Sequence, residues 1–277
     1  MNQAFPEVPR YAVTALDVET SYLMLGRGQT EPVLLLHGMS TAADSFRETM
    51  YGLADEFWLV APDIPGFGYS ANTRPYVIAH LVEWLAGLRL ALDLAPGPVI
   101  GHSFGGVLAI AYALAYTEDV TKLLLAAPSL LSQDGYPDFL KRAGIALGLV
   151  DLGSALSQSP LWVRRQIKVP FFAPEKQDES VWERRLKDYE LARASASVLK
   201  ASAFLDLAPS LAEIKQPVCL IWGENDPVVP ATDAQRLQAL LPRAEVHMLP
   251  KCGHVSILEQ PDLFQSVARE FLMGAAA

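Results

Sequence analysis

The sequence predicts an α/β fold in which a mostly parallel, eight-stranded sheet is flanked by helices and one helical segment is inserted. Short apolar runs alternate with helical segments along most of the chain, which is typical of parallel strands covered on both faces. This alternation stops over residues 130–205, where only helical periodicity is present. Before that stretch, a serine stands at a sharp turn from strand to helix. The 277 residues suffice for one such domain with an insertion.

The first part of the chain predicts four strands and one helix. Residues 11–17 and 21–26 are two short strands with a tight connection, which indicates an antiparallel hairpin at one edge of the sheet. The continuous apolar run 32–36 predicts a buried strand, and residues 57–61 predict another. Between these two runs, residues 45–55 carry apolar side chains at helical spacing.

The later elements continue the alternation up to the insertion and resume it afterwards. If the inserted helices follow the sixth strand, they lie over the carboxyl ends of the strands, where sheets of this type bind ligands. The remaining predicted elements are a helix over 77–93, a strand ending at residue 100, a helix over 107–115, a strand over 121–126, a strand over 218–222, a helix over 231–241, a strand over 244–249 and a helix over 255–273.

The serine turn has the sequence Gly101-His102-Ser103-Phe104-Gly105. At its apex, Ser103 is expected to adopt a positive φ, which costs a residue other than glycine about 1–3 kcal/mol. Gly101 and Gly105 stand where a Cβ would collide as the strand and the helix pass each other. This geometry exposes the Ser103 hydroxyl and places the Phe104 amide at the positive end of a helix. A Gly-Ser turn of this type can also merely connect a strand to a helix, so a catalytic interpretation requires further catalytic residues elsewhere in the chain.

Composition excludes several classes of function. Apolar residues make up 51% of the chain and charged residues 19%, which indicates a folded globular protein. The formal net charge of −9 argues against binding nucleic acid or an anionic membrane through bulk electrostatics. The longest apolar stretch, 143–163, is interrupted by Asp151 and by glycines, so no membrane span is expected. Residues 1–6 carry no secretory signal, and a cytoplasmic location is therefore the expectation.

The two cysteines predict neither a metal site nor a disulfide framework. Cys219 lies in an apolar strand and is expected to be a buried structural thiol. Cys252 precedes Gly253 and His254, but no metal-binding partner stands at short spacing from it. We therefore expect no metal and no cofactor.

Together with the segments around residues 226 and 254, these features make the whole chain resemble the α/β-hydrolase fold family. A serine, then an acid, then a histidine follow one another along the chain, which is the order found in that family. The resemblance implies a core formed by residues 1–129 and 206–277. It also implies a helical cap, or lid, formed by residues 130–205.

The resemblance implies a catalytic triad of Ser103, Asp226 and His254. Ser103 would be the nucleophile, because a serine hydroxyl needs a base within hydrogen-bonding reach. His254, in a loop between a strand and the last helix, would be that base. Asp226 follows an apolar strand and would orient the imidazole and stabilise its protonated form. Glu224 is a nearby rival for the acid, and an Asx turn at a strand end is the alternative explanation of Asp226. The other four histidines are expected to be structural or exposed.

Two further loops resemble loops of the family. His37-Gly38-Met39 is similar to the oxyanion loop, so the amides of Met39 and Phe104 would donate hydrogen bonds to the developing alkoxide. Gly38 would let the backbone approach the substrate closely. Residues 63–70, with the sequence Asp-Ile-Pro-Gly-Phe-Gly-Tyr-Ser, are expected to be structural.

A serine nucleophile favours attack at an acyl carbon. Epoxide hydrolases and haloalkane dehalogenases of the same fold use an aspartate at this position, and they are therefore excluded. The resemblance implies a carboxylesterase that forms an acyl-enzyme. The alternatives are a hydrolase of carbon–carbon bonds in ring-fission (meta-cleavage) products, an enol-lactonase, and a ligand receptor on the same scaffold. The first of these often has a tryptophan after the catalytic histidine, where this chain has Val255.

Aromatic residues in the predicted cap indicate a small to medium hydrophobic ester as substrate. The residues expected to contact it are Trp162, Phe171 and Trp182 in the cap and Gly38 and Val255 in the core. This small molecule is the only partner expected, and the protein is expected to be a monomer or a homodimer.

Arginine pairs in the predicted cap have two possible roles. Arg164, Arg165, Arg184 and Arg185 would hold a substrate carboxylate, or they would lie on solvated helix faces.

Overall fold

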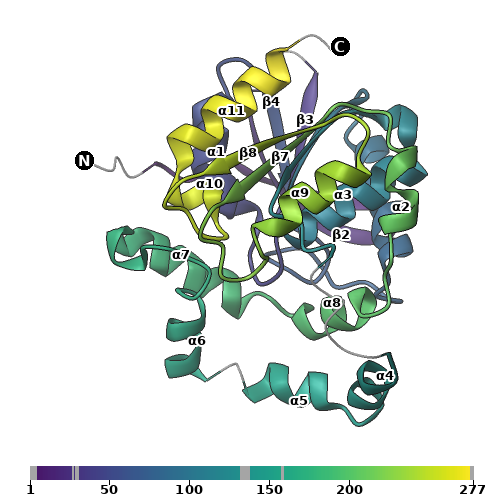
Figure 1. Cartoon of the computed structure of the whole chain (residues 1–277), viewed down its shortest axis with the longest axis vertical. Helices are drawn as coiled ribbons and strands as arrows, with labels where there is room; N and C mark the ends of the chain where they lie inside the picture. Colours follow the sequence, from purple (N-terminus) through teal and green to yellow (C-terminus); the bar gives the residue numbers. More distant parts are fainter. Residues whose placement is uncertain (1–4, 27, 29–30, 132–137, 157–158, 275–277) are drawn as a thin grey trace.

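An eight-stranded sheet runs through the centre of the computed structural model, which describes residues 5–26, 28, 31–131, 138–156 and 159–274 (Figure 1). Each strand coincides with one of the apolar or alternating runs of the sequence. The strands are β1 (Arg10–Ala15), β2 (Val18–Leu25), β3 (Pro32–Leu36), β4 (Trp58–Pro62), β5 (Gly97–His102), β6 (Val120–Ala126), β7 (Val218–Gly223) and β8 (Ala244–Leu249).

The strand order is β1-β2-β4-β3-β5-β6-β7-β8. β1 pairs with β2, and β2 with β4, in antiparallel directions, so the predicted hairpin forms one edge of the sheet. The pairs from β4 through β8 are parallel. The predicted class, a mostly parallel eight-stranded sheet flanked by helices, is therefore confirmed. β5 lies between β3 and β6, which places the serine turn at the middle of the sheet.

The side chains of the parallel strands alternate between two apolar cores, one on each face. Along β3, Leu34 and Leu36 belong to the core under α2, α3 and α9, whereas Val33 and Leu35 belong to the core under α1, α10 and α11. This alternation follows from the two-residue period of a strand, and burial on both faces explains why the strands are apolar throughout. The flanking helices are α1 (Arg47–Leu53), α2 (Ile78–Ala91), α3 (Phe104–Ala115), α9 (Thr232–Leu240), α10 (Ser256–Glu259) and α11 (Pro261–Met273).

Two predicted helices differ from the observed ones. The helix expected over 45–55 begins with a 3₁₀ turn, η1 (Ala43–Phe46), that leads directly into α1. The single helix expected over 255–273 is two helices, because Gln260 has φ −134° and ψ 54° and Pro261 starts α11. Proline disfavours helical geometry in the residue before it and provides no amide to continue a helix.

The described part of the segment between β6 and β7 is helical, as expected, and lies beyond one end of the strands, at the bottom of Figure 1. Residues 132–137 and 157–158 of the predicted cap lie outside the described residues. Ala194 N donates to Gly66 O after β4, and His254 N donates to Pro170 O after β8. The inserted helices therefore contact loops at the carboxyl ends of the strands. They are α4 (Asp138–Ala146), α5 (Leu149–Leu156), α6 (Pro160–Gln166), α7 (Glu179–Glu190) and α8 (Ser195–Ser202).

The inserted helices differ in how firmly they pack. α7 buries Val181 and Trp182 in the core on the α1 side, and α8 buries Val198 in the opposite core. α4 and α5 bury none of their described side chains. Among the described residues, no helix combines the length and the apolarity needed to cross a membrane.

Candidate active site

Ser103 is the residue between β5 and α3, and its backbone has φ 52° and ψ −117°. The positive φ expected at the apex of the turn is therefore confirmed. Ser103 N donates to Ala126 O of β6 at 2.9 Å, and Ser103 O accepts from the Gly106 and Val107 amides of α3. The neighbouring strand and the first turn of the helix thus hold a conformation that a serine rarely adopts.

Two glycines allow this turn to form. A Cβ on Gly101 would come within 2.6 Å of Gly105 O, because the strand and the helix pass each other there. A Cβ on Gly105 would come within 2.0 Å of Leu36 O, so this glycine lets α3 approach the end of β3. The second contact is to a different strand from the one expected from the sequence, but the steric reason is the same.

Asp226 and His254 lie side by side at the carboxyl ends of β7 and β8. His254 Nδ1 donates to Asp226 Oδ2 at 2.8 Å, and both side chains are buried. Asp226 Oδ1 accepts from the amides of Val228 and Val229, at 2.8 Å each. The Asp226 carboxylate therefore accepts both the backbone hydrogen bonds of the expected Asx turn and a hydrogen bond from His254. These three bonds fix its orientation. Glu224, the rival acid, is exposed.

His102 links the serine turn to the His254 loop. The two imidazole rings lie 4.9 Å apart between centroids, and His102 Nε2 hydrogen-bonds His254 O at 3.0 Å. Within the described residues, the Ser103 hydroxyl makes no hydrogen bond to His254.

The loop after β3 lies against Ser103. A Cβ on Gly38 would come within 3.2 Å of Ser103 Cβ and 3.0 Å of His102 Nδ1, so a side chain here would force these neighbours to shift by a few tenths of an ångström. Within the described residues, the amides of Met39 and Phe104 have no acceptor. Phe104 N also stands at the first position of α3, where the helix dipole favours negative charge.

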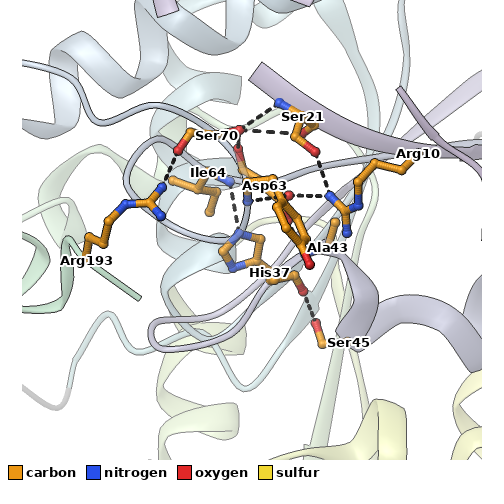
Figure 2. A network of polar contacts seen from close by, with 11 residues as sticks. Arg10, Ser21, His37, Ala43, Ser45, Asp63, Ile64, Ser70 and Arg193 are labelled. Carbon is orange, nitrogen blue, oxygen red and sulfur yellow. Dashed lines mark hydrogen bonds and ion pairs between the residues drawn. The ribbon is translucent and has the colours of Figure 1, made fainter. Parts of the chain in front are cut away.

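A buried network behind this loop fixes its backbone (Figure 2). His37 Nδ1 donates to Gly38 O at 2.8 Å, and His37 Nε2 accepts from Ile64 N at 2.9 Å. Burial lowers the pKa of His37, which keeps the ring neutral with one donor and one acceptor. His37 is thus structural, as expected, and it connects the Gly38 loop to the loop over 63–70.

Asp63 organises that second loop from a fully buried position. Its carboxylate accepts from Arg10 Nη1, from Ala43 N at 2.8 Å and from Tyr69 N at 3.0 Å. Ser70 Oγ donates to Asp63 O at 2.6 Å (Figure 2). The three hydrogen bonds to the ionised Asp63 carboxylate hold the loop over 63–70 in one conformation. Through His37, this loop in turn positions the loop that contains Gly38.

The aromatic residues expected at the substrate lie in different environments. Trp162 on α6 is 46% exposed. Phe171 and Trp182 are buried and pack edge to face with ring centroids 4.9 Å apart. Val255 is buried directly after His254.

The four cap arginines separate into three kinds. Arg164 and Arg165 are exposed, and Arg184 pairs with Glu48 of α1. Arg185 is 6% exposed, and its Nε and Nη1 have no partner among the described residues. Burial, together with the charges of His254 and Arg185, lowers the pKa of His102 to about 3. Arg184 and Arg185 are neighbours in the sequence, and their different environments follow from the way α7 packs against the core.

Glu259 of α10 connects the His254 loop to Phe172, which lies between α6 and α7. Its two carboxylate oxygens accept from Gly253 N at 2.9 Å and from Phe172 N at 2.7 Å. His254 N donates to Pro170 O at 2.7 Å alongside. This role of Glu259 was not predicted, because nothing near residue 259 in the sequence indicates a contact with residue 172.

Comparison with known proteins gives the family. A family model described as alpha/beta hydrolase fold matches residues 31–261. The chain belongs to the α/β-hydrolase family. The match includes the serine turn and the loops that carry Asp226 and His254, and it shows that the protein is a hydrolase of this fold.

Relatives within the α/β-hydrolase family include both an esterase and a dienoate hydrolase. A 2-hydroxy-6-oxo-6-phenylhexa-2,4-dienoate hydrolase of Burkholderia cepacia is 30% identical over 264 residues, covering 88% of each chain. A pimeloyl-[acyl-carrier protein] methyl ester esterase of Nitrosomonas europaea is 29% identical, covering 86% of this chain and 94% of the esterase. A solved thermophilic esterase of Thermogutta terrifontis superposes with a TM-score of 0.81 at 22% identity, covering 98% of this chain and all of the esterase, and supports the fold.

Proposed function

We propose that this α/β-hydrolase is a serine hydrolase that cleaves carboxylic esters of small to medium hydrophobic substrates. The observation that carries the proposal is the buried contact between His254 Nδ1 and Asp226 Oδ2, on a loop bonded to the residue before Ser103. An imidazole whose Nδ1 donates to a carboxylate presents an unprotonated Nε2 as base. Ser103, His254 and Asp226 are thus nucleophile, base and orienting acid in this proposal.

The proposed reaction proceeds through an acyl-enzyme. Ser103 Oγ bonds to the acyl carbon while its proton passes to His254 Nε2. Met39 N and Phe104 N, which have no acceptor among the described residues, stabilise the oxyanion. The bond to the alcohol then breaks, and His254 returns the proton to the leaving oxygen. Water then attacks the acyl carbon of the acyl-enzyme while its proton passes to His254 Nε2. The bond from the acyl carbon to Ser103 Oγ breaks, His254 returns the proton to Ser103 Oγ, and the carboxylic acid is released.

We further propose that residues 130–205 act as a cap over a core of residues 1–129 and 206–277. The contacts of Pro170 and Ala194 with loops at the carboxyl ends of the strands support this division. Trp162, Phe171 and Trp182 of the cap, with Gly38 and Val255 of the core, are the proposed substrate contacts. Substrate would then bind between the cap and the serine turn.

A carbon–carbon hydrolase acting on ring-fission products is the second candidate, and Arg185 favours it. Arg185 is a buried guanidinium whose charge acts on His102 of the serine turn and whose Nε and Nη1 have no partner among the described residues, so it is suited to a substrate carboxylate. Val255 in the position of a tryptophan argues the other way. An enol-lactone that carries a carboxylate would use the same cation.

A panel of substrates on matched variants tests these proposals. We expect turnover of p-nitrophenyl acetate and butyrate by the wild type and by Ser180→Ala, an exposed serine control. We expect none by Ser103→Ala. A fluorophosphonate probe should label the wild type and Ser180→Ala but not Ser103→Ala. Turnover of a ring-fission dienoate that Arg185→Gln abolishes, without loss of butyrate hydrolysis, would select the carbon–carbon hydrolase. Ligand binding without turnover of any substrate would instead indicate a receptor.

A further inference from the structure

Three side chains with metal-binding atoms meet at the edge of the sheet, on two neighbouring strands. Cys219 lies on β7, and Glu245 and His247 lie on β8, the last strand of the sheet. Cys219 pairs with Glu245 in the parallel ladder, and Ile221 pairs with His247. Because side chains on a strand alternate with a period of two, Cys219, Glu245 and His247 point to one face. The backbone ladder thus brings them together without any contribution from a loop.

The donor atoms of these side chains are close enough to share one ion. Cys219 Sγ, a carboxylate oxygen of Glu245 and a ring nitrogen of His247 all lie within 4.8 Å of one another. The His247 Nε2 to Glu245 Oε1 distance is 3.3 Å. Zinc takes sulfur at about 2.3 Å and nitrogen or oxygen at about 2.0–2.2 Å, so tetrahedral donors stand less than about 4 Å apart. Small side-chain rotations would bring the three atoms to that spacing.

Exposure differs among the three groups in a way that suits ion entry from solvent. Cys219 is fully buried, whereas the side chains of His247 and Glu245 are 34% and 55% exposed. The buried Cys219 sulfur is a soft donor, and His247 and Glu245 are donors that solvent can reach. An ion held by all three would therefore have its solvent-facing coordination position open to a water ligand. The two rim residues also have room to adjust, since β8 has no neighbouring strand on that side.

We propose that Cys219, Glu245 and His247 form a zinc-binding site on the edge of the sheet. Sulfur, imidazole and carboxylate are the donors that Zn²⁺ uses in proteins, whereas Mg²⁺ and Ca²⁺ take oxygen donors alone. On binding, the Cys219 thiol releases its proton to solvent as the metal–sulfur bond forms. Water fills the fourth position.

The site is separate from the proposed catalytic residues and has a structural role. Cys219 stands near the start of β7, whereas Asp226 follows the end of that strand. An ion held by both strands ties β8 to the sheet, and β8 leads directly into the loop with His254. Binding to the folded state alone raises the stability of the protein. This inference holds whether or not the chain hydrolyses esters.

Cobalt substitution tests the site on the full chain after removal of metal by a chelator. We expect Co²⁺ to produce a thiolate-to-cobalt charge-transfer band and tetrahedral d–d bands, and we expect Zn²⁺ to displace both. His247→Gln should weaken binding by at least about tenfold, since it removes one of three protein ligands. His80→Gln is the matched control, because His80 forms a comparable pair with Glu83 at 3.6 Å on α2.

Thermal unfolding provides an independent measurement. Zn²⁺ should raise the Tm of the wild type and of His80→Gln, and at the same concentration it should raise the Tm of His247→Gln by less. Cys219→Ala should abolish the charge-transfer band even if the variant is less stable. A band that is absent from the wild type, or Zn²⁺ binding and Tm shifts that are equal in the wild type and His247→Gln, would overturn the proposal.

Discussion

His102 Nε2 and the backbone carbonyl of His254 are joined by a hydrogen bond of 3.0 Å. Burial lowers the pKa of His102 to about 3, so the ring is neutral at ordinary pH and carries its proton on the donating Nε2. The bond therefore connects the serine turn directly to the backbone of the proposed base. It does so independently of the side-chain contact with Asp226.

Replacing His102 by leucine should disturb both stability and activity. The change leaves the buried His254 carbonyl without its donor, which costs about 1–3 kcal/mol of unfolding free energy. Urea unfolding measures this loss, and butyrate hydrolysis by the folded fraction measures the effect on the rate. His102→Gln, whose amide can donate, should recover part of both. Equal behaviour of the leucine and glutamine variants would show that the hydrogen bond is unimportant.

Replacing Ser103 by glycine should abolish activity and stabilise the fold. Glycine adopts a φ of 52° without the strain that serine has there, so the unfolding free energy should rise by about 1 kcal/mol. Ser103→Ala is the matched control, because it also lacks the hydroxyl but retains the Cβ. Chemical denaturation compares the two variants. A glycine variant no more stable than the alanine variant would contradict the assignment of strain.

Asp226→Asn should inactivate the enzyme while leaving it folded. The amide oxygen can still accept from Val228 N and Val229 N, but the amide nitrogen would face His254 Nδ1 and favour the wrong tautomer. In a serine protease this change lowers kcat by about 10⁴, and we expect a loss of similar order. Glu224→Gln, at an exposed carboxylate, should retain wild-type kcat. Rates on p-nitrophenyl butyrate and far-ultraviolet circular dichroism check both statements.

Asp188 should make the fold less stable as the pH rises through the acidic range. Burial raises the pKa of this carboxyl to about 7, against its ordinary value of 3.8, although Arg185 acts in the opposite direction. A raised pKa means that the folded state binds more protons, so its contribution is complete below about pH 4 and is lost as the pH approaches 7. Asp188→Asn should therefore show a shallower fall in unfolding free energy between pH 4 and 7. Parallel curves for the two proteins would exclude this role.

Sequence patterns revealed the parts of this protein that depend on local chemistry. The strand alternation, the glycine-flanked turn at Ser103 and its positive φ follow from period, sterics and spacing, and the expected contact between Asp226 and His254 is present. These features need only neighbouring residues or adjacent strand ends.

Features that depend on packing between distant segments were not predictable in the same way. Arg184 and Arg185 are adjacent in the sequence, yet Arg184 pairs with Glu48, whereas Arg185 is buried and its Nε and Nη1 have no partner among the described residues. Cys219 lacks a metal-binding neighbour in the sequence, and only the strand register brings it beside Glu245. The direction of each side chain on α7 determines the environments of Arg184 and Arg185, and the pairing of β7 with β8 places Cys219 beside Glu245. Neither of these can be recognised from a short stretch of sequence.

The bonds from His254 N to Pro170 O and from Phe172 N to Glu259 fasten one end of the inserted helices to the proposed base. Lifting residues 170–172 away from the sheet would break both bonds and displace the imidazole. If the protein acts as proposed, a substrate path that keeps both bonds intact would pass the opposite end of the insertion, where α4 and α5 bury no described side chain. We therefore expect the α4–α5 half of the insertion to open at a lower free energy than the half bonded to His254 and Glu259.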